Sequence, residues 1–110
     1  MKIKQREIYL VPFPFSDFSD KKVRPVVVIS NNKFNLSDDI IVCGITSNIL
    51  KDFYSVEVGG LEEGSLSDNC CVKVENILRV SKTLLIRKIG KLKKENFSEV
   101  LSKLGDIFKE

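Results

Sequence analysis

The sequence predicts a small α+β domain, mainly β, in which a strongly bent sheet or barrel is followed by one C-terminal helix. Two observations lead to this prediction. Between residues 8 and 88, short runs rich in valine and isoleucine alternate with turn-forming Pro, Gly, Asn and Asp. Beyond residue 96, the apolar spacing becomes that of a helix. Several short strands followed by one packed helix favour this architecture, and 110 residues suit one domain, 1–110, with a single core.

Three strands are predicted in the N-terminal half of the chain. Apolar residues run from Ile8 to Pro12, a first strand of about five residues that two prolines bring to an end. Pro25 opens a second, buried strand over Val26 to Ile29, because proline at the start of a strand loses only one possible ladder bond. The third strand is expected over Ile40 to Thr46.

The remaining strands are predicted between residues 53 and 88. Residues 53–58 alternate in polarity and form the expected fourth strand. Three glycines between residues 59 and 64 then mark turns. Cys70 to Arg79 is the predicted fifth strand, and Leu84 to Lys88 a short sixth.

The C-terminal helix is predicted from apolar residues at i, i+3, i+4 and i+7, with Lys and Glu on the opposite face. These residues are Phe97, Val100, Leu101, Leu104, Ile107 and Phe108. Gly105 weakens such a helix by about 1 kcal/mol relative to alanine. A start near Lys93 provides no good N-cap, and Asn96 is the nearest candidate.

Composition excludes several classes of protein and site. The chain has no apolar run near the roughly 18 residues that span a bilayer, and its N-terminus lacks the features of a secretory signal, so a cytoplasmic location is expected. The net charge of +3 does not by itself indicate a nucleic-acid partner. Histidine is absent from the sequence, which excludes any histidine-based triad, acid-base pair or metal site.

The three cysteines indicate neither a disulfide framework nor a zinc site. Their number is odd, Cys70 and Cys71 are adjacent, and no CxxC motif occurs. Cys43 and the adjacent pair have apolar neighbours, so we expect all three to be buried as small hydrophobic residues.

Arg24 stands out because it begins an apolar run, in the stretch KKVRPVVVIS. An arginine beside a buried strand is usually paired or used. Pairing with Asp17 or Asp20 at the edge of the barrel is one interpretation. The other is anion binding, because the planar guanidinium matches phosphate oxygens and stays protonated.

Four stretches, EIYLVPFPFSD, VRPVVVIS, IIVCGITSN and VKVENILRVSK followed by KIGKL, together resemble the MazF/PemK family of toxin endoribonucleases. The likeness extends from Glu7 to the final helix. It implies an SH3-like barrel closed by a C-terminal helix, as in CcdB and MazF proteins, and a homodimer. It also implies sequence-selective cleavage of single-stranded RNA without metal or other cofactor, and a cognate antitoxin that blocks the RNA groove.

The resemblance also implies the active-site residues. In the family, these are the arginine of the RP pair and the threonine or serine that ends the following strand, which match Arg24 and Thr46. Ser47 is adjacent and offers a second hydroxyl. RNA is cleaved when its own 2′-hydroxyl attacks the phosphorus, so the protein must stabilise charge and move protons. The base is left open between Asp17 or Asp20, a hydroxyl with an ionised neighbour, and water.

Further residues are candidates for RNA contact, each with a structural alternative. Aromatic rings stack on bases, but packing is the alternative role for Phe15 and for its neighbours Phe13 and Phe18. Lysines follow phosphates, although each one can equally lie on a solvated face. The lysines considered are Lys21, Lys22, Lys73, Lys82 and Lys88.

The sequence departs from the family at two places. Arg6 stands where a small turn residue is common, and Asn69 with Cys70 where Asp-Ser is frequent. These changes leave Arg24 and Thr46 intact, but they bear on sequence preference and catalytic efficiency. The alternative functions are a noncatalytic CcdB-like toxin that binds DNA gyrase, and a degenerate relative that only binds an antitoxin.

Overall fold

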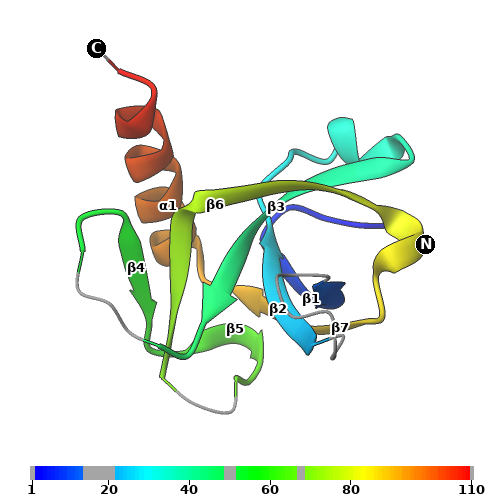
Figure 1. The fold of residues 1–110 in the computed structure, drawn as a ribbon, viewed down its shortest axis with the longest axis horizontal. Helices are drawn as coiled ribbons and strands as arrows, with labels where there is room; N and C mark the ends of the chain where they lie inside the picture. The colour runs from blue at the N-terminus through cyan, green and yellow to red at the C-terminus, as the bar shows by residue number, and fades with distance from the viewer. Residues whose placement is uncertain (1, 14–21, 49–51, 67–68, 110) are drawn as a thin grey trace.

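The computed structural model describes residues 2–13, 22–48, 52–66 and 69–109. In this part of the chain, seven antiparallel strands form one curled sheet in the order β4-β6-β3-β2-β1-β7-β5, and one α-helix lies along β4 and β6 (Figure 1). The predicted α+β, mainly β class is confirmed. The strands are β1 (Glu7–Phe13), β2 (Lys22–Val28), β3 (Asp39–Thr46), β4 (Ser55–Val58), β5 (Leu61–Gly64), β6 (Cys70–Ser81) and β7 (Arg87–Leu92). The helices are η1 (Phe34–Leu36), η2 (Lys82–Leu84) and α1 (Lys94–Ile107).

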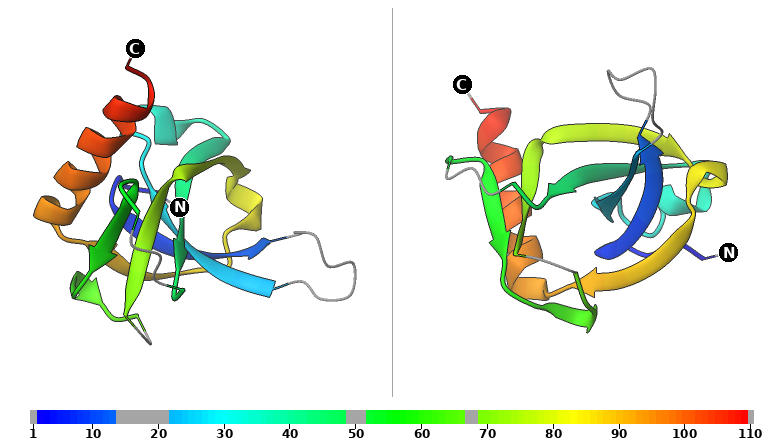
Figure 2. Two further views of the ribbon diagram at one scale, coloured as in Figure 1. Left: turned by 60° about the vertical axis from the view of Figure 1, so that its left-hand side comes forward. Right: turned by 60° about the horizontal axis from the view of Figure 1, so that its bottom comes forward.

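The β1–β2 hairpin is longer than the two strands expected from the sequence. Its pairing extends from Ile8↔Val27 to Phe13↔Lys22, and it projects from the rest of the sheet (Figure 2). Pro25 therefore lies inside β2 and does not open it, at a point where β2 pairs with β1 alone. Because β3 does not pair with β2 at Pro25, the missing N–H of proline costs no hydrogen bond to β3.

A strand was missed at β5, where only turns were expected. The segment LEEG has weak strand propensity, but Leu61 pairs with Leu92 and Gly64 with Gly90 in β7. Two glycines permit this close pairing. Gly64 has a φ of 75°, and a Cβ on Gly90 would lie 2.7 Å from the backbone oxygen of Glu63.

The predicted sixth strand over Leu84 to Lys88 was wrong in its position. Residues 82–84 form η2, whose start is capped by the Ser81 hydroxyl accepting a hydrogen bond from the N–H of Thr83. The strand follows as β7, from Arg87 to Leu92, because its main partner β1 pairs Glu7 with Lys91 and Leu10 with Arg87.

Side chains of β2 alternate between two apolar clusters, which explains the uninterrupted run PVVVI. Val27, and Ile29 directly after the strand, belong to a cluster between the sheet and α1, together with Phe97 and Val100. Val26 and Val28 belong to a second cluster within the curl of the sheet. Both faces of β2 are thus covered from Val26 to Val28, as expected for a continuously apolar segment. The predicted burial of the three cysteines is confirmed.

Helix α1 begins at Lys94 with Lys93 as its N-cap residue and no side-chain capping bond. The expected lack of a good cap is confirmed, but Asn96 as the candidate cap was wrong. Asn96 lies inside the first turn and donates a hydrogen bond to the backbone oxygen of Glu57 at 3.5 Å. Neither α1 nor the short helical turns of the described chain is long and apolar enough to cross a membrane.

Candidate functional site

The register between β2 and β3 brings Arg24 level with Thr46. Val28 pairs with Val42 and Val26 with Gly44. Two residues further along each strand, Arg24 and Thr46 occupy matching positions, and side-chain alternation places them on the same face of the sheet. The paired ladder stops at Val26, so the two residues lie where β2 and β3 are no longer joined.

Arg24 is exposed on a strand whose next residues are buried. Its backbone is fixed by pairing with Val11 on β1. Among residues 2–13, 22–48, 52–66 and 69–109, the Arg24 guanidinium makes no hydrogen bond or ion pair. The alternative partners Asp17 and Asp20 lie outside the described residues, as do Phe15, Phe18 and Lys21. Arg24 therefore combines a backbone fixed by strand pairing with a charged side chain that is exposed to solvent.

Thr46 is half-buried at the end of β3. Its Oγ1 accepts a hydrogen bond from the N–H of Asn48 at 3.1 Å, which fixes the turn that follows the strand. The same hydroxyl still has a hydrogen to donate. Ser47 follows directly and is exposed.

A bulge in β6 adds further polar groups to this site. Cys43 pairs with Ile77, but its neighbour Gly44 pairs with Lys73, so Val74 to Asn76 have no partner on β3. Asn76 then packs over Gly44, where a Cβ would lie only 2.6 Å from the Asn76 amide nitrogen. Glycine at this position therefore makes room for an amide side chain beside the strand that ends at Thr46.

Lys73 shares the face of Thr46, because it pairs directly with Gly44 on β3. Its Nζ lies 3.6 Å from a carboxylate oxygen of Glu75, and both groups are partly exposed. An exposed pair of this kind contributes little to stability, about 0–1 kcal/mol. The pair lies at the bulge of β6, where Lys73 is opposite Gly44 of β3.

Gly44, Glu75 and Asn76 were missed by sequence reasoning. A glycine inside the strand pattern IIVCGIT was a signal of close approach. Nothing local in VKVEN indicated a bulge, because the register change depends on how β6 pairs with β3 and β4 together.

Two lysines predicted to follow phosphates lie away from this group. The Lys88 Nζ forms ion pairs with Glu7 at 3.0 Å and with Glu63 at 3.1 Å. Lys82 follows the opposite end of β6, where Ser81 pairs with Asp39. Lys22 begins β2 opposite Phe13, two residues from Arg24.

The buried carboxylate of Glu7 belongs to a structural network. Burial alone raises the pKa of Glu7, but hydrogen bonds from the Lys4 N–H, from Lys88 and from Tyr9 together hold it below the ordinary value. Burial and the adjacent Glu7 charge raise the pKa of Tyr9 to about 12. These groups therefore stay ionised and neutral, respectively, at neutral pH.

Arg6, one of the departures from the family pattern, makes a separate set of polar contacts. It has a φ of 78°, which is unusual for a residue other than glycine. Its guanidinium binds Glu62 at 3.0 Å and the backbone oxygen of Leu92 at 2.9 Å. The side chain thus joins β5 to the end of β7.

Comparisons with known proteins agree with this fold. Residues 4–108 match the model of a family described as PemK-like, MazF-like toxin of type II toxin-antitoxin system. The toxin MazF-mt6 of Mycobacterium tuberculosis is 21% identical with a TM-score of 0.78, covering 94% of this chain and 96% of that one. MazF from Deinococcus radiodurans is 16% identical with a TM-score of 0.79, covering 97% and 96%.

A mycobacterial endoribonuclease, solved in complex with its cognate antitoxin, is 18% identical with a TM-score of 0.77, covering 94% of this chain and 92% of that one. A comparison with curated proteins gives no match. At such identities, the solved structures establish a shared fold.

Proposed function

Because the chain belongs to the family of PemK-like, MazF-like toxins of type II toxin-antitoxin systems, we propose that it is an endoribonuclease that cleaves single-stranded RNA. The single observation that supports this most is the placement of Arg24 level with Thr46 at the open end of β2 and β3. This pair offers a permanent cation and a hydroxyl at a solvent-facing site.

In the proposed reaction, the 2′-oxygen of one nucleotide attacks the adjacent phosphorus, and the 5′-oxygen of the next nucleotide leaves and takes a proton from water. The products are a 2′,3′-cyclic phosphate and a 5′-hydroxyl. Arg24 holds the nonbridging oxygens as negative charge builds on them, an effect worth a rate factor of about 10² to 10³. The Thr46 hydroxyl donates to the phosphate and fixes the line of attack.

Within the part of the chain that the structure describes, we assign the carboxylate of Glu75 as the group that accepts the 2′-hydroxyl proton. The support for this assignment is the ion pair of Glu75 with Lys73, at 3.6 Å, since Lys73 shares the face of Thr46. A carboxylate without histidine is a weak base near neutral pH, so positioning and charge stabilisation supply most of the catalysis.

Two partners follow from the proposed function. One is a cognate antitoxin, in line with the related structures of MazE-MazF from Deinococcus radiodurans and of the mycobacterial endoribonuclease with its antitoxin. The other is a second copy of this chain, because symmetric dimers with isologous contacts are the commonest oligomers. Sedimentation at micromolar concentration tests the dimer, and an active monomer would exclude it.

Incubation of the purified protein with a long RNA of mixed sequence in EDTA tests the activity. We expect fragments with 2′,3′-cyclic phosphate and 5′-hydroxyl ends, and cleavage slower by about 10² to 10³ with an Arg24→Ala protein. A strict magnesium requirement would contradict the mechanism. Intact RNA together with inhibition of DNA gyrase would instead establish the noncatalytic alternative.

A further inference from the structure

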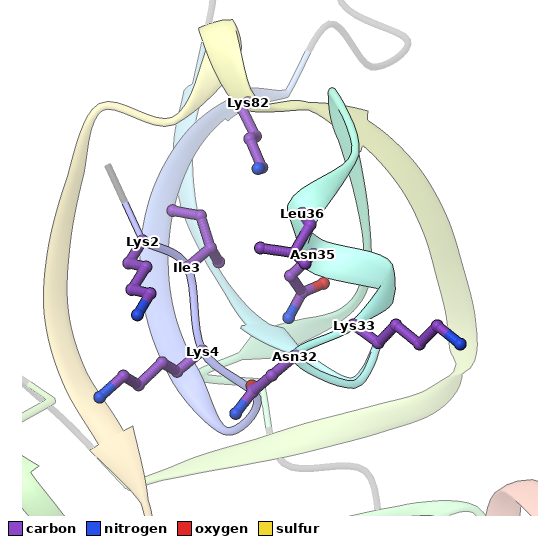
Figure 3. Close-up of a pocket in the computed structure, with 8 residues that line it drawn as sticks. All are labelled: Lys2, Ile3, Lys4, Asn32, Lys33, Asn35, Leu36 and Lys82. Atoms are coloured by element: carbon purple, nitrogen blue, oxygen red, sulfur yellow. The ribbon is translucent and has the colours of Figure 1, made fainter.

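A pocket of about 480 Å³ lies at the end of the barrel opposite Arg24. It forms where the N-terminal segment meets the turn between β2 and β3 and the start of η2 (Figure 3). β2 runs from Lys22, next to the candidate active site, to Val28, next to this pocket. The pocket and Arg24 are therefore separated by most of the length of a strand. Its lining residues are Lys2, Ile3, Lys4, Asn32, Lys33, Asn35, Leu36 and Lys82.

Asparagine side chains hold the walls of this pocket in place. Asn35 is 2% exposed, donates to the backbone oxygen of Ser30 at 2.9 Å and accepts from the Ser30 hydroxyl. Asn32 accepts a hydrogen bond from the Gln5 N–H at 2.9 Å, which ties the N-terminal segment to the turn. The pocket is thus built on a hydrogen-bonded frame.

Four lysines line the pocket, and they come from three separate segments; Figure 3 shows Lys82 pointing into the opening and Lys33 extending away from it. Within the described part of the chain, none of the four forms an ion pair, and no carboxylate lines the pocket. The nearby Glu7 is buried and bound to Lys88 and to the Lys4 N–H, while Asp38 offers its backbone oxygen to the Lys82 N–H. A group of like charges without counter-ions favours an anionic ligand.

Two aliphatic residues contribute to the lining of the pocket. Ile3 is 3% exposed, whereas Leu36 is 74% exposed. Figure 3 shows Ile3 and Leu36 on facing sides of the opening, with Lys82 reaching toward the space between them. The described lining contains no aromatic ring or arginine, the groups on which nucleobases stack. An aliphatic group flanked by negative charges therefore fits the pocket better than a nucleic acid does.

We propose that this pocket docks an acidic segment of a partner protein. An aliphatic side chain of the segment inserts between Ile3 and Leu36, and its carboxylates meet the lysine rim. The inference goes beyond the proposed RNA cleavage, because docking here requires neither RNA nor Arg24.

A titration of the ¹⁵N-labelled protein tests the site. The probe is a synthetic peptide with two leucines among six glutamates, and the comparison peptide has serines in place of the leucines. We expect chemical-shift changes confined to residues 2–4, 32–36 and 82, with the leucine peptide alone. The double variant K33E/K82E should weaken binding at least about tenfold.

A charge-matched control separates docking from general attraction. K93E/K94E makes the same change in net charge at the exposed start of α1 and should leave the affinity nearly unchanged. Leu36→Ser changes an exposed residue, so it should keep the fold and weaken the leucine peptide by severalfold. If K33E/K82E does not fold, Leu36→Ser still tests the site.

Three results would overturn the proposal. The first is equal binding of the serine peptide, or an equal loss in K93E/K94E, which indicates unspecific charge attraction. The second is that hexauridylate shifts the pocket residues while the peptide does not, which indicates nucleic acid. The third is concentration-dependent shifts of the same residues without peptide, which indicates that a second copy of the chain covers the pocket.

Discussion

Gly44→Ala should disturb the candidate site more than it disturbs the fold. A Cβ at Gly44 would lie 2.6 Å from the amide nitrogen of Asn76 and 3.3 Å from its Cγ, so the amide must move away. Because the crowded atoms belong to the end of a side chain, we expect a loss of about 1 kcal/mol, the low end of overpacking costs. RNA cleavage should fall further than this loss of stability explains, since Asn76 leaves its place beside β3.

A double-mutant cycle measures this contact directly. Urea unfolding and single-turnover RNA cleavage are compared for Gly44→Ala, Asn76→Ala and the double variant. Because Asn76→Ala removes the crowded amide, the double variant should be more stable than the sum of the single changes, by about 0.5–1 kcal/mol. Gly59→Ala is the matched control, because nothing lies within 4 Å of its added Cβ. Additive effects would refute the packing of Asn76 over Gly44.

Three other predictions address separate parts of the structure. Gly90→Ala should lower the free energy of unfolding in urea by about 3 kcal/mol, because the added Cβ would lie 2.7 Å from the Glu63 backbone oxygen and a backbone atom moves less easily than a side chain. A loss no larger than that of Gly44→Ala would contradict the expectation that Gly90→Ala is the more destabilising change. Because the pKa of Glu7 lies below its ordinary value of 4.5 in the folded protein, ionised Glu7 stabilises the fold at pH values above 4.5, and this contribution should be lost as the pH falls below 4.5. Glu7→Gln should therefore flatten that part of the profile of melting temperature against pH. An unchanged profile would disprove the role of Glu7. Glu75→Gln should lower the single-turnover cleavage rate about 10²-fold with nearly unchanged RNA affinity, and a parental rate would exclude Glu75 as the base.

The strands with strong residue preferences were predictable from the sequence. The run from Val26 to Ile29 indicated a buried strand, and its side chains are buried. The segment LEEG was not predictable, because only its pairing with β7 and the conformation of Gly64 make it a strand. The shift of the sixth strand to Arg87–Leu92 likewise depends on pairing with β1.

The candidate site was predictable where it follows strand ends. Arg24 and Thr46 flank two recognisable strands, so their approach follows once β2 and β3 pair as neighbours. Asn76 lies over Gly44, and Glu75 pairs with Lys73, because of an irregular register in β6 that arises from pairing on two sides at once. Bulges of this kind leave little local trace in a sequence.

Single-turnover cleavage of RNA at saturating protein, run beside thermal melts, tests the role of Arg24 most directly. Arg24→Ala should fold normally and lose about 10² to 10³ in rate. Arg24→Lys keeps the charge without the bidentate fork and should lose at least about tenfold while still binding RNA. Arg87→Ala, which removes another exposed arginine, should cleave at the parental rate. If Arg24→Ala cleaves RNA at the parental rate but melts far lower, the arginine is structural and the assigned active site is wrong.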